Sequence, residues 1–165
     1  MFLEARAANC FASTYVLKFK GNAVGKYETR FLSEGVDIAL TGRRQLRFEK
    51  VGWVGSNFSL GEAGSDKAIG SVDRAGVFSS SWELRFKAGA ARLERTGFFD
   101  SGYVVRAGHE TVASVDRLGM CQRGWVVQAA DGDLTLEEMI LVGLVYHVIL
   151  SRQAQHAAAA GHAGS

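Results

Sequence analysis

Apolar and polar residues alternate one by one in several short segments of the chain, which is the pattern of strands that bury one face. Trp82, Leu84 and Phe86, for example, alternate with charged neighbours. Glycines separate the segments, as expected for tight turns. The pattern predicts ten to twelve short strands. The same alternation covers 15–19, 27–31 and 36–41.

Part of the chain is duplicated. The stretch from Ile69 reads IGSVDRAGVFSSSWELRF, and the stretch from Val112 reads VASVDRLGMCQRGWVVQA, at an offset of 43 residues. Upstream, FEKVGWVGSNFSL from Phe48 matches LERTGFFDSGYVV from Leu93 at an offset of 45. A two-residue difference in one connecting loop reconciles the offsets. Periods of about 20–50 residues mark repeated supersecondary units. Two copies predict a pseudo-symmetric single domain.

After Gly132 the pattern changes to that of a helix. Thr135 and Glu138 form a capping box, and Arg152 suits the negative end of the helix dipole. The sequence therefore predicts a helix over 136–152. Residues 139–150 are apolar on every face, so this helix must be enclosed. These twelve residues are fewer than the ~20 of a membrane span, and the sequence favours burial over insertion.

Two residues of this helix need an explanation. Gly143 weakens a helix but fits a place where a strand approaches closely. His147 has two interpretations, a core histidine bonded to backbone or a ligand, and the apolar surroundings favour the first.

Together, these elements predict a mainly β fold: a closed antiparallel barrel of about twelve strands, with internal duplication, that encloses a hydrophobic C-terminal helix. A barrel of this size has a lumen that wall side chains alone do not fill, and a helix about 10 Å across does. We expect one domain over 13–152, an N-terminal segment over 1–12 and a flexible tail over 153–165.

The composition is that of a globular protein, and the net charge bears on which class of partner the protein binds. The chain has 165 residues, 47% hydrophobic and 22% charged, with 20 glycines and no proline. A net charge of +2 is too small to indicate a nucleic-acid partner. Cys10 and Cys121 make no disulfide framework, and whether they pair is open. No secretory signal pattern begins the sequence, so we expect a cytoplasmic protein.

Candidate catalytic groups are few. Asp73 and Asp116 recur in the Asp-Arg-x-Gly units, which favour a tight hairpin turn that the aspartate opens. The glycine three places on, Gly76 or Gly119, would supply a positive φ. A paired-carboxylate site is the alternative. A tail pair, His156 and His162, could bind a metal. His109, in the predicted hairpin RAGHET, is the histidine left for catalysis. We predict no catalytic residues, no metal site and no cofactor, because no nucleophile, metal or phosphate-loop motif occurs.

The duplicated units IGSVDR…W and VASVDR…W, followed by DGDLTLEEMILVGLVYHVILSR, resemble the tubby-like barrel superfamily, which includes phospholipid scramblases and LURP-one-related proteins. The resemblance covers roughly 13–152. The chain differs from scramblases, which have a proline-rich region and a cysteine cluster. Tubby proteins bind phosphoinositide head groups through basic residues on the barrel, and the resemblance implies a similar patch. The candidates are Arg43, Arg44, Arg47 and Lys50.

Arg47 and Lys50 lie on opposite faces of their predicted strand, so a solvated hairpin end is the alternative to a lipid patch. We predict a non-enzymatic binding module that associates with anionic phospholipid or a membrane surface, without an integral span and without nucleic acid. It would be cytoplasmic, peripheral to the membrane. A structural or protein-interaction domain, and an enzyme of unknown class, are the alternatives.

Overall fold

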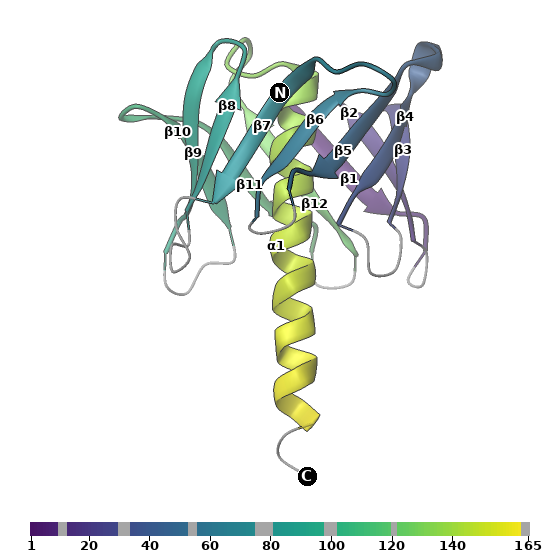
Figure 1. The fold of residues 1–165 in the computed structure, drawn as a ribbon, viewed down its shortest axis with the longest axis vertical. Helices are drawn as coiled ribbons and strands as arrows, with labels where there is room; N and C mark the ends of the chain where they lie inside the picture. Colours follow the sequence, from purple (N-terminus) through teal and green to yellow (C-terminus); the bar gives the residue numbers. More distant parts are fainter. Residues whose placement is uncertain are drawn as a thin grey trace.

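The computed structural model describes residues 1–9, 13–29, 34–52, 56–74, 81–97, 102–119 and 122–162, and the side chains of all of these except 161 and 162. It is a barrel of twelve strands around one long helix, α1 (Leu136–His162) (Figure 1). The strands are β1 (Phe2–Ala7), β2 (Thr14–Phe19), β3 (Asn22–Thr29), β4 (Val36–Leu40), β5 (Gln45–Lys50), β6 (Phe58–Glu62), β7 (Ala68–Arg74), β8 (Trp82–Phe86), β9 (Gly89–Arg95), β10 (Tyr103–Ala107), β11 (Glu110–Arg117) and β12 (Gly124–Ala129).

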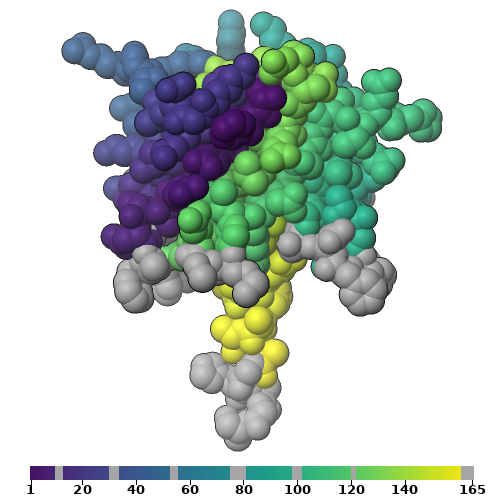
Figure 2. Space-filling model, turned by 180° about the vertical axis from the view of Figure 1, so that it is seen from behind, coloured from purple at the N-terminus to yellow at the C-terminus, as the bar shows by residue number. Residues whose placement is uncertain are grey.

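Every strand pairs antiparallel with the next one along the chain, and β12 pairs with β1 to close the barrel. Figure 2 shows β1 in purple lying along β12 in green. The segment 1–12 was expected to lie outside the domain, and this boundary is wrong, because Leu3 and Ala5 of β1 are fully buried. Closure removes the free edges that an open sheet would expose.

The predicted duplication corresponds to two successive four-strand units, β5–β8 and β9–β12. The length difference falls between the second and third strands of each unit, and a register shift occurs at the same place in both. It follows Leu60 in β6 and Val105 in β10, which are 45 residues apart. The repeat therefore includes the bulge that bends the wall.

The first four strands form a third unit, which the sequence pattern did not reveal. The shift in β2 follows Leu17, at the place equivalent to Leu60 and Val105. Tyr27, Val72 and Val115 are likewise equivalent, since each lies opposite the aromatic residue two positions before its unit's bulge. The wall is thus three variations of one four-strand meander.

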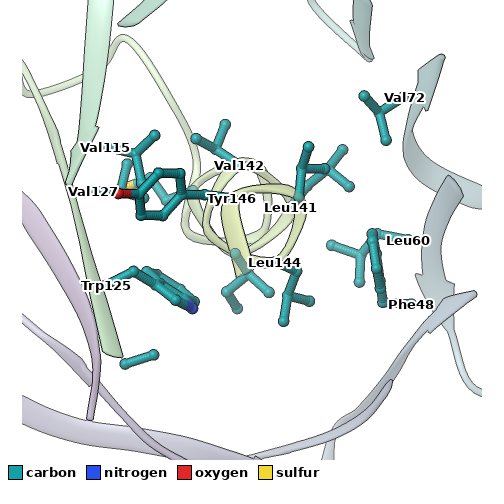
Figure 3. Packing of buried hydrophobic residues seen from close by; sticks show 14 of the residues in the cluster. Phe48, Leu60, Val72, Val115, Trp125, Val127, Leu141, Val142, Leu144 and Tyr146 are labelled. Atoms are coloured by element: carbon teal, nitrogen blue, oxygen red, sulfur yellow. The ribbon is translucent and has the colours of Figure 1, made fainter. Parts of the chain in front are cut away.

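The barrel encloses the apolar part of α1, as the sequence predicts. Figure 3 looks along the helix and shows Leu141, Val142, Leu144 and Tyr146 directed outward to the wall, which contributes residues such as Phe48 and Val115. The residues 139–146 of α1 are all buried. The helix is therefore the centre of the core.

The start of α1 is as predicted. The Glu138 amide donates to Thr135 Oγ1 (3.3 Å), and the Thr135 amide donates to Glu138 Oε2 (2.8 Å), which completes the capping box. The end differs from the prediction, because the helix continues past Arg152 to His162. We call residues 153–162 the stem. It projects from the barrel along the helix axis (Figures 1 and 2).

The predicted role of Asp73 and Asp116 as turn formers is wrong. Both lie within strands, where Asp73 is opposite Glu83 and Asp116 is opposite Val126. Gly119, which was expected to supply a positive φ, is not among the glycines that do so. The ladder continues one residue beyond each aspartate, so the turns begin later. Gly76, Cys10 and Cys121 lie outside the described residues.

Candidate functional site

The structure does not bring the four predicted lipid residues into one patch. Arg44 makes ion pairs with Glu62 (2.8 Å) and with Glu137 at the start of α1. On the outer wall, Arg47 pairs with Asp37 at 3.0 Å. Lys50 is at the opposite end of β5, facing the interior, with its ammonium 3.8 Å from Glu34. These residues are spread along the length of the barrel.

A different set of cations gathers at the end of the barrel from which the stem emerges. The six odd-numbered strands all run toward this end, and four of them, β5, β7, β9 and β11, finish on a basic residue. In each of these four strands, the basic residue lies on the inner face of the sheet, like the buried residue two positions before it, such as Val72 or Leu93. The four residues are Lys50, Arg74, Arg95 and Arg117.

Two further arginines complete this set. Arg123 precedes β12, and Arg152 is on α1 just before the stem. We call Lys50, Arg74, Arg95, Arg117, Arg123 and Arg152 the basic mouth.

One side of the basic mouth is neutralised by Glu34. The guanidinium of Arg152 donates two hydrogen bonds to this carboxylate (2.6 and 3.0 Å) and a third to Ser56 Oγ (2.7 Å). Arg152 also lies over the rings of Phe58 and Trp82, 5.7 and 5.8 Å from their centroids. The hydrogen bond from Arg152, with the charges of Arg152 and Lys50, lowers the pKa of Glu34 despite its partial burial. This contact fixes α1 to the wall.

The other side holds three arginines around two tyrosines. Tyr103 is directly opposite Arg95 in the ladder, and its ring meets that of Tyr146 at 5.8 Å between centroids. Burial raises the pKa of both phenols. Positive charge on Arg95 and Arg74 opposes this at Tyr103, and Arg117 opposes it at Tyr146 through its charge and a hydrogen bond. The charges of the three arginines therefore act on this pair of hydroxyls.

His147 is partly buried against the core, and the hydrogen bond of its ring is to a side chain, where the sequence predicted a bond to backbone. Its Nδ1 is 3.5 Å from the hydroxyl of Tyr27, which accepts a hydrogen bond from Trp125 Nε1 (3.0 Å). The imidazole also meets the rings of Tyr15 and Tyr27 edge-on. Burial, and then the charge of Arg123, lower the pKa of His147 to about 4. Neutral His147 and the Tyr27 hydroxyl thus share this hydrogen bond.

The aspartates and the remaining histidines make no catalytic arrangement within the described residues. Asp73 pairs with Arg85 at 3.4 Å. His109 is exposed in the two-residue turn between β10 and β11, as its hairpin position predicts. The described part of the chain holds no group of three or more His, Cys, Asp or Glu residues placed to bind a metal.

A hollow of about 400 Å³ on the outer wall has mixed charge. Arg47 and Lys67 line it together with Glu49, Glu62 and Asp66. Cations and carboxylates occur side by side there, so it favours neither sign of ligand.

No family model, no curated protein and no solved structure matches the chain, so the comparisons assign it to no family. Within the described ranges, no helix is both long enough and apolar enough to cross a membrane.

The basic mouth was not predicted from the sequence, although a signal for it is present. A basic residue stands two positions before a glycine six times in the sequence, and in four of these cases it is the last residue of its strand. The four are Lys50-Val51-Gly52, Arg74-Ala75-Gly76, Arg95-Thr96-Gly97 and Arg117-Leu118-Gly119. Their convergence depends on strand direction and facing, which only the closed barrel fixes.

Proposed function

We propose that the protein is a non-enzymatic binding module of the tubby-like barrel type, which docks on anionic phospholipid through its basic mouth. One observation carries the proposal: six cations lie at one end of the barrel, and Glu34 pairs with two of them. Clustered Lys and Arg side chains near an anionic bilayer contribute about 1 kcal/mol each to binding.

The stem fits this orientation. Its ten helical residues extend about 15 Å at 1.5 Å per residue. A flat membrane surface therefore reaches the basic mouth only if the stem enters the membrane or lies along the membrane surface. Residues 153–162 include no Asp, Glu, Lys or Arg. With Arg152 at the level of the head groups, an uncharged stem enters the interfacial region at a low electrostatic cost. Because the cytoplasmic leaflet carries anionic lipid, we expect the protein to be a peripheral protein of that leaflet.

Vesicle co-sedimentation tests the proposal. The wild-type protein should bind phosphatidylserine-containing vesicles, should not bind pure phosphatidylcholine vesicles, and should lose binding as salt screens the charges. Arg74→Glu plus Arg95→Glu should weaken binding at least about tenfold, on the scale of ~1 kcal/mol per charge. The matched control is Arg43→Glu plus Arg44→Glu, the same charge change at the opposite end of the barrel, which should bind like the wild type.

Two results would overturn the proposal. One is equal binding to both kinds of vesicle. The other is loss of binding in the Arg43/Arg44 variant with retention in the Arg74/Arg95 variant, which would return the site to the hairpin between β4 and β5. A thermal unfolding curve for each variant shows that the barrel is intact.

A further inference from the structure

We propose that Glu34 is an autoinhibitory counter-ion of the basic mouth: its carboxylate occupies Arg152 and Lys50, and an anionic surface must displace it before these two cations contribute to docking. The inference rests on the proposed function and deepens it, because it names how the docking site is regulated. It predicts that the protein discriminates densely charged membranes from weakly charged ones.

Glu34 makes with Arg152 the same kind of contact that an external anion would make. The guanidinium donates to both carboxylate oxygens, from Nε to Oε1 at 2.6 Å and from Nη2 to Oε2 at 3.0 Å. Arginine binds carboxylate and phosphate groups through this arrangement of two parallel bonds. The Lys50 ammonium lies 3.8 Å from Glu34 Oε2. One carboxylate of the chain therefore occupies two cations of the mouth.

The pair lies where an approaching surface can reach it. The side chain of Glu34 is 33% exposed and that of Arg152 is 25% exposed, so neither is enclosed. Arg152 directly precedes the stem, at the end of the barrel that the proposed function turns toward the membrane. Its guanidinium is also held by Ser56 Oγ and by the rings of Phe58 and Trp82. Arg152 can therefore exchange one anion for another without leaving its place on the wall.

Competition, and not protonation, has to remove Glu34 from the mouth at neutral pH. The hydrogen bond from Arg152 is the main cause that lowers the pKa of Glu34, so the carboxylate stays charged. A ligand on the same chain acts at an effective concentration on the order of millimolar, which a single soluble anion at lower concentration does not overcome. A charged bilayer presents many anions at once to the neighbouring cations, and so it can displace the carboxylate.

Vesicles with increasing fractions of phosphatidylserine in phosphatidylcholine test the proposal. Glu34→Gln keeps the shape of the side chain and one acceptor for Arg152, and it releases two cations. This variant should bind a given anionic vesicle at least about tenfold more tightly than the wild type, as expected for two released cations. It should also reach half-maximal binding at a lower fraction of phosphatidylserine.

Glu49→Gln is the matched control. It is the same substitution one residue before Lys50, and the residue is exposed on the outer face of β5. It changes the net charge equally without releasing a cation of the mouth. The control should therefore gain no more than the roughly fivefold effect of a single charge.

Lys50→Gln gives a second measurement, in the wild type and in the Glu34→Gln background. In the wild type Glu34 already holds Lys50, so the substitution should change vesicle binding by less than about twofold. In the Glu34→Gln background the same substitution should weaken binding about fivefold, the effect of one free cation. The difference between the two effects is the coupling that a double-mutant cycle measures.

The outcomes separate the regulation from the docking function. Equal binding of the wild type and Glu34→Gln, or an equal gain in Glu34→Gln and Glu49→Gln, overturns the regulation and leaves docking intact, with Glu34 serving only to fix α1. Failure of both the wild type and Glu34→Gln to bind any anionic vesicle overturns docking, and the regulation with it. If thermal unfolding shows that Glu34→Gln does not fold, Lys50→Gln in the wild type decides, and a fivefold weakening there overturns the proposal.

Discussion

His147 illustrates how one residue depends on contacts that come from far along the chain. It sits against Tyr15 and Tyr27, and Trp125 adds a hydrogen bond to the Tyr27 hydroxyl. The apolar sequence around His147 predicts that it is buried. The sequence cannot predict the Tyr27 partner, because that contact spans 120 residues and depends on the register of the barrel.

His147 makes stability depend on pH over a defined window. Its pKa is about 4 in the folded protein, against about 6.5 in the unfolded chain. The unfolded state therefore binds the extra proton first, so the free energy of unfolding is highest above pH 6.5 and falls as the pH drops toward 4. The expected loss is roughly 3 kcal/mol. Urea unfolding at a series of pH values measures it.

Two variants test this assignment, each with a histidine replaced by glutamine, whose side chain does not titrate. His147→Gln should flatten the profile between pH 6.5 and 4, whereas His109→Gln, at the exposed turn, should leave it unchanged. Glu34, whose pKa is lowered, contributes a further loss below its ordinary value of 4.5 in either protein. A His147→Gln profile identical to that of the wild type would contradict the assignment.

At the scale of the element, α1 fits the wall closely on one side. A Cβ added to Gly143 would lie 2.2 Å from carbons of the Trp125 ring, and Trp125 is fully buried. The sequence predicts such an approach at Gly143, because glycine is otherwise unfavourable inside a helix. The partner strand, β12, was not predicted.

Gly143→Ala gives a change of known sign. In a solvated helix this substitution is stabilising by about 1 kcal/mol. Here the added methyl group collides with the indole, so we expect a loss of about 1–3 kcal/mol, which urea unfolding followed by Trp fluorescence will measure. The control is Gly97→Ala, where a Cβ meets nothing within 4 Å. A Gly143→Ala protein as stable as the wild type would show that the helix can shift away from β12.

The wall and the enclosed helix could be predicted because their signals are local: alternation in strands, a capping box, and a helix without a polar face. The first strand was missed because its inward residues include small ones, Ala5 and Ala7, which give a weak alternation. Small residues also conceal the third unit, β1–β4, because Ala7 occupies the position that is equivalent to Lys50 and Arg95 in the other two units. Asp73 was misplaced because Asp-Arg-x-Gly also occurs at a strand end.

At the scale of the whole molecule, the helix is fixed to the wall at both ends of the barrel. Arg44, in the hairpin between β4 and β5, pairs with Glu137 in the first turn of α1. Arg152 pairs with Glu34 where the helix leaves the barrel. Between these two contacts, α1 is almost entirely buried, and beyond Arg152 its described side chains are exposed.

Two truncations follow from this division. A chain ending at Arg152 loses only exposed helix, so its unfolding temperature should match that of the full chain. A chain ending at Leu134 loses the whole helix, which leaves the lumen of a twelve-stranded barrel without its filling; we expect no cooperative unfolding transition. Differential scanning calorimetry compares the two. A cooperative transition in the shorter chain would show that the wall holds its shape alone.

The pairing of β1 with β12 has a cost during synthesis. The first strand leaves the ribosome on the order of ten seconds before its last neighbour, at elongation rates of about 5–20 residues per second. In that interval the nascent sheet exposes unpaired backbone groups along its edge and apolar side chains on its inner face. Both promote aggregation. We therefore expect yield in cells to depend on chaperone supply more than the stability of the finished protein would suggest.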